Sequence, residues 1–198
     1  MLRFVLASAS PARRRLLESA GIPAEVLLSG VDESTVDASD AATLCLFLAR
    51  LKAEAVAARL DGEVLVLGCD SVLEFAGAAL GKPADAAEAT RRWRAMRGRS
   101  GILHTGHCLI RLSDGKRAEA TAGTTVHFAE VTDEEIAAYV GTGEPLQVAG
   151  AFTIDGRGGP FVEYIEGDHS NVIGLSLPLL RRLLAELGIG LTDLWSSG

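Results

Sequence analysis

The chain has 198 residues, 48% of them hydrophobic and only 5% aromatic, which predicts a folded core built mainly from Ala, Val, Leu and Ile. The formal net charge of −7 disfavours stable nucleic-acid binding, and Cys45, Cys69 and Cys108 are too widely spaced for a zinc site and are expected to be reduced and buried. No apolar run is long enough for a signal peptide or a membrane span, so a cytoplasmic protein without membrane attachment is expected.

The N-terminal segment predicts a strand, a polar loop and a helix. Arg3 to Ala7 form a short apolar run, and a helical pattern then continues through about Ala20, where Gly21 follows. Ser10 is suited to the N-cap and Pro11 to the first helical position. Because backbone N–H groups and the positive helix end would point into the loop, we expect an anion to bind there.

A long helix and a buried strand are predicted next. Alanines and leucines recur at helical spacing from Asp40 to Leu60, and Val64 to Leu67 form the continuous apolar run of a strand buried on both faces. Asp70 sits at the end of that strand, and a second apolar piece covers Val72 to Phe75. Since ligands bind at the carboxyl ends of strands in open α/β sheets, Asp70 is a candidate site residue. The equally weighted alternative is a turn aspartate that caps local N–H groups.

The second half of the chain predicts an antiparallel hairpin among helices and loops. Residues 102–112 and 118–128 form its two strands, joined by the turn Ser113-Asp114-Gly115. The other expected elements are helices over 84–96, 132–140 and 177–187, a strand over 161–166 and a glycine-rich loop over 141–159. No repeat or low-complexity linker divides the chain, so residues 1–198 are expected to form one α/β domain.

Basic residues beside two turns are candidates for phosphate contacts. Lys82 lies between Gly81, which lets a backbone approach a ligand, and Pro83, which stiffens the turn. Ala76 stands where a Walker loop needs its first glycine, so P-loop chemistry is excluded. The run from Arg13 to Arg15 adjoins the predicted anion-binding loop. The alternatives are a surface lysine and a solvated helix face, and at least one of the three arginines must face solvent because successive helix positions point in different directions.

An acidic pair precedes the long helix. Asp32 and Glu33 supply hard carboxylate oxygens of the kind that Mg²⁺ prefers, and an ordinary acidic loop is the alternative. The four histidines show neither zinc spacing nor a nucleophile elbow, so they are assigned no catalytic role.

Each of these signals is weak alone, but their order along the chain is specific. The sequence resembles the Maf family of nucleotide pyrophosphatases. In chain order the matching segments are Leu6 to Arg13, Val31 to Ser34, Lys52-Ala53, Gly68 to Val72, Leu80 to Pro83, His104 to Gly106, Glu144-Pro145, Ala149 to Phe152 and Gly167 to Leu175. Together they span almost the whole chain.

The resemblance implies both a fold and a reaction. The fold would be Maf/ITPase-like, an α/β fold with a mixed, elongated sheet flanked by helices and with two lobes around a nucleotide-binding cleft. A nucleoside triphosphate would bind with a divalent metal cation (Mg²⁺, Mn²⁺ or Co²⁺), water would attack the α-phosphorus, and pyrophosphate would leave.

The resemblance also implies roles for individual residues. Asp70 would accept the proton of the attacking water or bind the metal at the same place, and Glu33 would help to place that ion. The residues that would hold the triphosphate are Ser8, Arg13, Lys52 and Lys82. They would offset the charge that builds on the leaving group.

Departures from the family pattern concern substrate choice. The positions that the family associates with specificity are Ala12, Ser71 and Asp155, and many members carry Arg at position 12 and Gln at position 155. Gln147 and Val148 stand where many members have Asp-Lys. The base preference of pyrimidine-specific members is therefore not assumed for this chain. One lysine that many members have among their phosphate-binding residues is absent.

Two other functions are kept as alternatives. The Maf family is linked with inhibition of septum formation, so the chain could instead be a nucleotide-binding regulator that acts through a protein partner. A general phosphatase that releases orthophosphate from the γ end ranks last, because no phosphate-transfer cysteine loop or aspartyl nucleophile motif is recognised. For the enzyme we expect a house-cleaning role on standard or modified triphosphates, and a homodimer is left open as its assembly.

Overall fold

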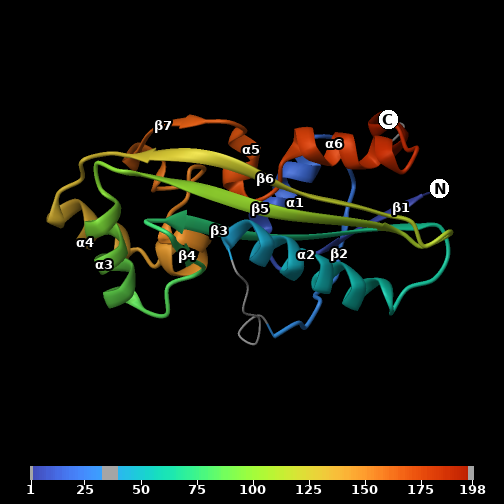
Figure 1. Cartoon of the computed structure of the whole chain (residues 1–198), viewed down its shortest axis with the longest axis horizontal. Helices are drawn as coiled ribbons and strands as arrows, with labels where there is room; N and C mark the ends of the chain where they lie inside the picture. The colour runs from blue at the N-terminus through green and yellow to red at the C-terminus, as the bar shows by residue number, and fades with distance from the viewer. Residues whose placement is uncertain (1, 33–39, 196–198) are drawn as a thin grey trace.

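The computed structural model describes residues 2–32 and 40–195, which form an elongated sheet with helices on both faces (Figure 1). The strands are β1 (Arg3–Ala7), β2 (Glu25–Val26), β3 (Val64–Phe75), β4 (Ala78–Leu80), β5 (Ser100–Arg111), β6 (Arg117–Phe128) and β7 (Val162–Glu166). The α-helices are α1 (Pro11–Ser19), α2 (Ala41–Ala57), α3 (Ala86–Met96), α4 (Asp133–Gly141), α5 (His169–Ile173) and α6 (Leu177–Glu186). Short 3₁₀ helices are η2 (Glu144–Gln147), η3 (Ala149–Ala151), η4 (Gly159–Phe161) and η5 (Leu191–Leu194). In this described part of the chain, no helix combines the length and the apolar character that crossing a membrane requires.

The sheet contains both parallel and antiparallel strands. Its order is β2-β1-β3-β5-β6-β7, and β4 pairs with β3 outside this path. β1 runs parallel to β2 and β3, whereas the neighbours from β3 through β5 and β6 to β7 run antiparallel. The β5–β6 hairpin and the mixed α/β architecture confirm the expected fold class.

Alternation along β3 divides its side chains between the two faces of the sheet. Val66 packs with Ala53 of α2 in one cluster of buried side chains, whereas Leu67 belongs to a second cluster with Leu183 of α6. Because successive side chains of a strand point to opposite faces, the same alternation places Asp70 on the α2 face. Both faces are covered, as the continuous apolar run predicts.

The end of the molecule that holds α3 and α4 has its own aromatic core (Figure 1). The Trp93 ring meets Phe128, Tyr139 and Phe161 edge-on, at centroid distances of 5.6, 5.6 and 5.8 Å. Its indole N–H donates to the carbonyl oxygen of Ala151 at 2.7 Å. Edge-to-face rings and a satisfied indole make this core specific in shape, and it forms the second of the two expected lobes on the shared sheet.

Several elements differ from the predictions. β3 is one continuous strand, so Asp70 lies within a strand and not at its end. The pairing of β3 with β1 stops at Gly68, which leaves Asp70 just beyond the parallel part of the sheet. Strands β2 and β4 and helix α5 were not expected, because two, three and five residues carry too little periodic signal.

Candidate active site

Two glycines let helix α2 lie directly against the sheet. A Cβ atom on Gly68 would come within 2.1 Å of the Ala49 carbonyl oxygen, and one on Gly106 within 2.4 Å of the Cys45 carbonyl oxygen. These separations are far below van der Waals contact, so only glycine permits the observed packing. Gly106 is the cross-strand partner of Asp70, which means that the close approach occurs beside that carboxylate.

The approach of α2 brings Lys52 to Asp70. The Lys52 Nζ atom lies 2.5 Å from Asp70 Oδ1, and both side chains are 9% exposed. Buried charges need partners, since each would otherwise lose its hydration without compensation. An ammonium at this distance favours the ionised carboxylate, which is the form that a proton acceptor or a metal ligand requires.

Arg13 of α1 binds four oxygen atoms around the same stretch of β3. Its Nε atom donates to the Gly174 carbonyl oxygen at 2.6 Å. Its Nη1 atom donates to Ser8 Oγ and to the Cys69 carbonyl oxygen, both at 3.0 Å, and its Nη2 atom donates to Ser71 Oγ at 3.0 Å. Arg13 is 8% exposed and ties α1 to β3 and to the turn after α5.

Among the described residues, the four hydrogen-bond partners of the Arg13 side chain are all uncharged. A guanidinium carries five N–H donors, so these bonds leave one N–H for another acceptor. The Ser8 Oγ atom accepts from Arg13 and from the Ser10 backbone N–H, which leaves its own proton to donate. A buried cation surrounded by neutral oxygens, next to a hydroxyl donor, is suited to an anion that supplies the counter-charge.

The helix that carries Arg13 begins as predicted. Ser10 is its N-cap, with the Oγ atom accepting from the Arg13 backbone N–H at 3.4 Å, and Pro11 is its first residue. The positive end of α1 therefore faces the Ser8 loop and adds to the attraction for an anion there.

Ser71 extends the hydrogen-bond network to β5 and α5. Its Oγ atom lies 2.9 Å from the Oγ1 atom of Thr105, its cross-strand partner, and the Thr105 hydroxyl donates to the Asn171 carbonyl oxygen at 3.2 Å. The single hydroxyl proton of Thr105 is used in the bond to Asn171, so Thr105 Oγ1 must accept a hydrogen bond from the Ser71 hydroxyl. The Ser71 oxygen in turn accepts from Arg13. The orientation of the Ser71 hydroxyl is therefore fixed on both sides. Sequence reasoning assigned no role to Thr105.

A sequence model of the Maf family, described as Maf-like protein, matches residues 3–187. The chain belongs to the Maf family. The nucleoside triphosphate pyrophosphatase of Salinispora tropica is 67% identical, with 100% of this chain and 89% of that protein covered. The proteins of the same name from Streptomyces coelicolor and Streptomyces avermitilis are 63% and 60% identical, each with 98% of this chain and 95% of the relative covered. The solved Ham1 protein of Staphylococcus aureus is a distant likeness, with a TM-score of 0.45 and 17% identity over 65% of this chain and 72% of that chain.

In this Maf chain, the candidate residues fall into two groups that meet on β3. Lys52 pairs with Asp70 on one face, and Arg13 binds the neighbouring residues Cys69 and Ser71. Lys82 belongs to neither group, because it is exposed at the turn after β4 and forms no hydrogen bond or ion pair with another described residue. Glu33, the predicted metal ligand, lies outside the described residues.

The three predicted specificity positions are gathered around α1. Ala12 precedes Arg13 on that helix, and Ser71 accepts from the Arg13 guanidinium. Asp155 approaches from the loop after η3, with its Oδ2 atom 3.6 Å from Nη2 of Arg15. The Arg15 side chain is 65% exposed, as expected for at least one arginine of the run.

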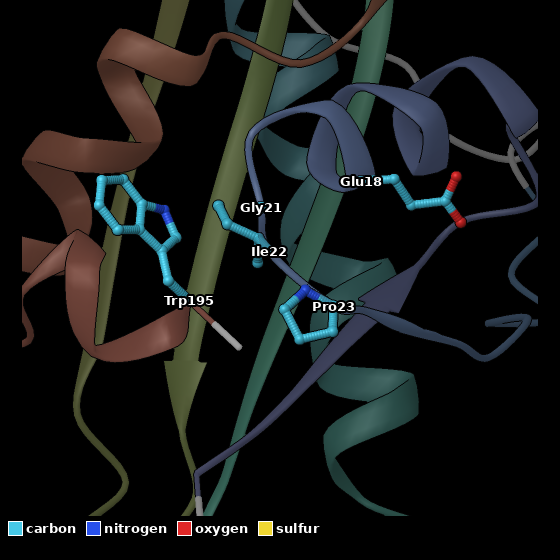
Figure 2. A pocket seen from close by; sticks show the side chains of 5 residues that line it. All are labelled: Glu18, Gly21, Ile22, Pro23 and Trp195. Atoms are coloured by element: carbon cyan, nitrogen blue, oxygen red, sulfur yellow. The ribbon is translucent and has the colours of Figure 1, made fainter. Parts of the chain in front are cut away.

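Two surface hollows lie apart from these groups. One has a volume of about 320 Å³. It is lined by Glu18, Gly21, Ile22, Pro23 and Trp195, whose side chains Figure 2 shows. Another, of about 550 Å³, is lined by Thr142, Gly143, Glu144, Gln147 and Arg157. Since neither is lined by Asp70 or Arg13, neither corresponds to the predicted nucleotide-binding cleft.

A fully buried histidine supports the Arg13 side of the site. His107 Nδ1 lies 3.0 Å from the Thr105 carbonyl oxygen, and Nε2 accepts from the Ser176 backbone N–H at 2.8 Å. These partners require a neutral ring with its proton on Nδ1. Burial lowers the pKa of His107 to about 4, and the charge of Arg13 acts in the same direction. The neutral His107 ring thus holds the N-terminus of α6 in place.

The protein is expected to lose stability in acid through His107. Above pH 6.5, the ordinary pKa that applies to the unfolded chain, the His107 ring is neutral in both the folded and the unfolded protein. Between pH 6.5 and about pH 4, only the unfolded protein binds a proton at this ring. The free energy of unfolding should therefore fall by roughly 3 kcal/mol over this interval. Urea titrations at pH 7 and pH 4.5 measure it, with His107→Gln as the control that keeps a donor and an acceptor. An equal loss in His107→Gln would contradict the assignment.

Proposed function

We propose that this chain hydrolyses nucleoside triphosphates, standard or modified, to the monophosphate and pyrophosphate. The observation that carries the proposal is the buried Lys52–Asp70 pair beside the Arg13 guanidinium, a carboxylate paired with an ammonium next to a cationic anion site. Membership of the Maf family and the shared name of the relatives at 60% to 67% identity support it.

Asp70 is the proton acceptor for the attacking water in this proposal. Its charge is maintained by Lys52, and its position on the continuous strand β3 fixes it rigidly. A positioned carboxylate that takes a proton in the transition state accelerates a reaction by about 10²- to 10⁴-fold. The bond that forms joins the water oxygen to the α-phosphorus, and the bond that breaks releases pyrophosphate.

The cationic residues bind the triphosphate and stabilise the charge on the leaving group. After their hydrogen bonds to described residues, Arg13 has one N–H and Ser8 has its hydroxyl proton to donate to phosphate oxygens. Lys82 is exposed, and in this proposal its flexible side chain turns toward the bound triphosphate. Two hydrogen bonds hold its turn: the Gly81 carbonyl oxygen accepts from the Gly150 backbone N–H at 3.1 Å and from the Arg92 side chain, through Nη1, at 2.6 Å.

The proposal includes a divalent cation that would bind at Asp70 together with the substrate. Residues 2–32 and 40–195 contain no cluster of three or more His, Cys, Asp or Glu side chains that would hold a metal alone. Mg²⁺ is usually bound by one or two carboxylates together with substrate phosphates and water, so Asp70 and the predicted Glu33 would suffice with a triphosphate present. Mg²⁺, Mn²⁺ or Co²⁺ held there would neutralise phosphate charge.

The experiment that tests the function identifies the products. Wild-type protein is incubated with canonical and modified triphosphates and with Mg²⁺, Mn²⁺ or Co²⁺, and the released nucleotide and phosphate are separated by ion-exchange chromatography. We expect monophosphate and pyrophosphate. Nucleoside diphosphate and orthophosphate would indicate a general phosphatase. No turnover with any combination of triphosphate and metal would favour the nucleotide-binding regulator, a role that the names of the relatives do not support.

Replacing Arg13 by Lys is expected to weaken both folding and nucleotide binding. One ammonium cannot reach four oxygens that surround a planar guanidinium, so the free energy of unfolding should fall by about 2 kcal/mol and the KM for the triphosphate should rise about tenfold. Arg14→Lys is the control, because that side chain is 60% exposed on the same helix and pairs only with Glu18 among the described residues. Equal thermal stability of the two variants would contradict the anchoring role.

A further inference from the structure

One carboxylate in the glycine-rich loop is surrounded by hydrogen-bond donors. Glu144 Oε1 accepts from the Tyr139 hydroxyl at 2.9 Å and from the Thr153 hydroxyl at 2.6 Å. The same oxygen accepts from the Gly158 backbone N–H at 3.1 Å, and Oε2 accepts from the Arg157 N–H at 3.1 Å. Four donors from two parts of the chain therefore converge on one side chain.

Glu144 is held as an anion by these bonds. Burial raises the pKa of its carboxyl, but the hydrogen bonds from Thr153, Arg157, Tyr139 and Gly158 outweigh burial and bring the pKa below its ordinary value. Bonds to an ionised acceptor are stronger than bonds between neutral groups, so the charge of Glu144 contributes to the rigidity of the loop.

At two glycine positions, the segment from Thr153 to Gly158 passes too close to Glu144 and Tyr139 to carry a side chain. A Cβ atom on Gly156 would lie 2.7 Å from Glu144 Oε2, and one on Gly158 would lie 2.4 Å from the Tyr139 hydroxyl oxygen. Glycine at both positions lets the backbone follow the carboxylate. The path of this segment is thus determined by Glu144 and by Tyr139 of α4.

The same segment crosses to the helix that carries Arg13. Asp155 lies between the residues that contact Glu144, and its carboxylate is 3.6 Å from the Arg15 guanidinium on α1. The segment is therefore anchored to the α3–α4 lobe through Glu144 and meets the other lobe through Asp155.

We propose that Glu144 is a positioning residue that fixes the segment from Thr153 to Gly158, holds Asp155 beside the N-terminal half of α1, and thereby sets the selectivity of the enzyme among nucleotide bases. The inference rests on the proposed function. Glu144 acts through Asp155 and the loop backbone, so its removal should affect the choice of base more than the chemical step.

The test compares base discrimination in a double-mutant cycle. The kcat/KM values of the four canonical ribonucleoside triphosphates are measured for wild type, Glu144→Gln, Asp155→Asn and the double variant. Glu144→Gln should lower the ratio between the best and the worst substrate about tenfold, mainly through KM, because the neutral amide weakens four charge-assisted bonds. The double variant should be no less selective than either single variant, since both act on one element.

Controls separate positioning from simple loss of folding. Glu163→Gln changes an exposed carboxylate on β7 and should match wild type. Tyr139→Phe removes a single donor and should shift the discrimination ratio in the same direction by a smaller factor, which keeps the test decisive if Glu144→Gln folds poorly. A uniform fall in kcat/KM for all four nucleotides, with the ratio between the best and the worst substrate unchanged, would overturn this inference and leave the proposed function standing. A wild type that hydrolyses no nucleotide would overturn the proposed function and this inference together.

Discussion

Asp70→Asn is expected to abolish detectable turnover, a loss of at least roughly a thousandfold, because the amide cannot accept a proton from water. The amide retains the shape of the carboxylate and an oxygen that can accept from Lys52. The Lys52 ammonium no longer faces the charge of Asp70, so the free energy of unfolding should fall by about 2 kcal/mol without unfolding the protein at 25 °C. Steady-state release of pyrophosphate, with circular dichroism on the same sample, measures both effects.

The matched control is Asp61→Asn, which neutralises an exposed aspartate in the turn after α2. It should keep wild-type activity and stability. Full activity in Asp70→Asn would remove this carboxylate from the mechanism, whatever the stability of the variant.

Gly106→Ala is expected to displace α2 from the sheet and to damage both stability and catalysis. The new methyl group would meet the Cys45 carbonyl carbon and the Leu46 Cα atom at 2.5 Å, and backbone atoms cannot move aside as a flexible side chain does. Overpacking of this kind should lower the free energy of unfolding by about 3 kcal/mol. Because Lys52 lies on the displaced helix, kcat should fall about a hundredfold.

Gly123→Ala on the neighbouring strand β6 is the control for that prediction. A Cβ atom there would have its nearest contacts at 3.5 Å, from the side chains of His104 and Ile102, which is ordinary van der Waals distance. Urea denaturation and nucleotide turnover of the two variants give the comparison. Equal stability of Gly106→Ala and Gly123→Ala would show that α2 does not depend on the glycine.

Much of the fold follows from local sequence signals. Helix α1 starts at the predicted Ser10-Pro11 boundary, the capping box of Thr132 and Glu135 opens α4, and the 102–128 hairpin forms as expected. These signals are short-range, since a cap or a turn involves residues close in sequence.

The prediction that Asp70 lies at the end of its strand was wrong, because local signals do not report pairing with a distant strand. Polar residues interrupt the apolar run, and pairing with β5 still continues the strand through them.

The contacts of the candidate site depended on packing between distant segments. Arg13 binds the carbonyl oxygen of Gly174, 161 residues away, and backbone oxygens carry no signal in the side-chain pattern. One signal was present and unused. Isolated glycines within strands mark close backbone approach, so Gly68 and Gly106 could have indicated where a helix meets the sheet.

The most direct test of the central claim is hydrolysis of a nucleoside triphosphate in water enriched in ¹⁸O, with the label located by mass spectrometry of both products. Water attack on the α-phosphorus, with Asp70 as the proton acceptor, predicts one ¹⁸O atom in the monophosphate and none in the pyrophosphate. Label in the pyrophosphate, or in released orthophosphate, would contradict the account.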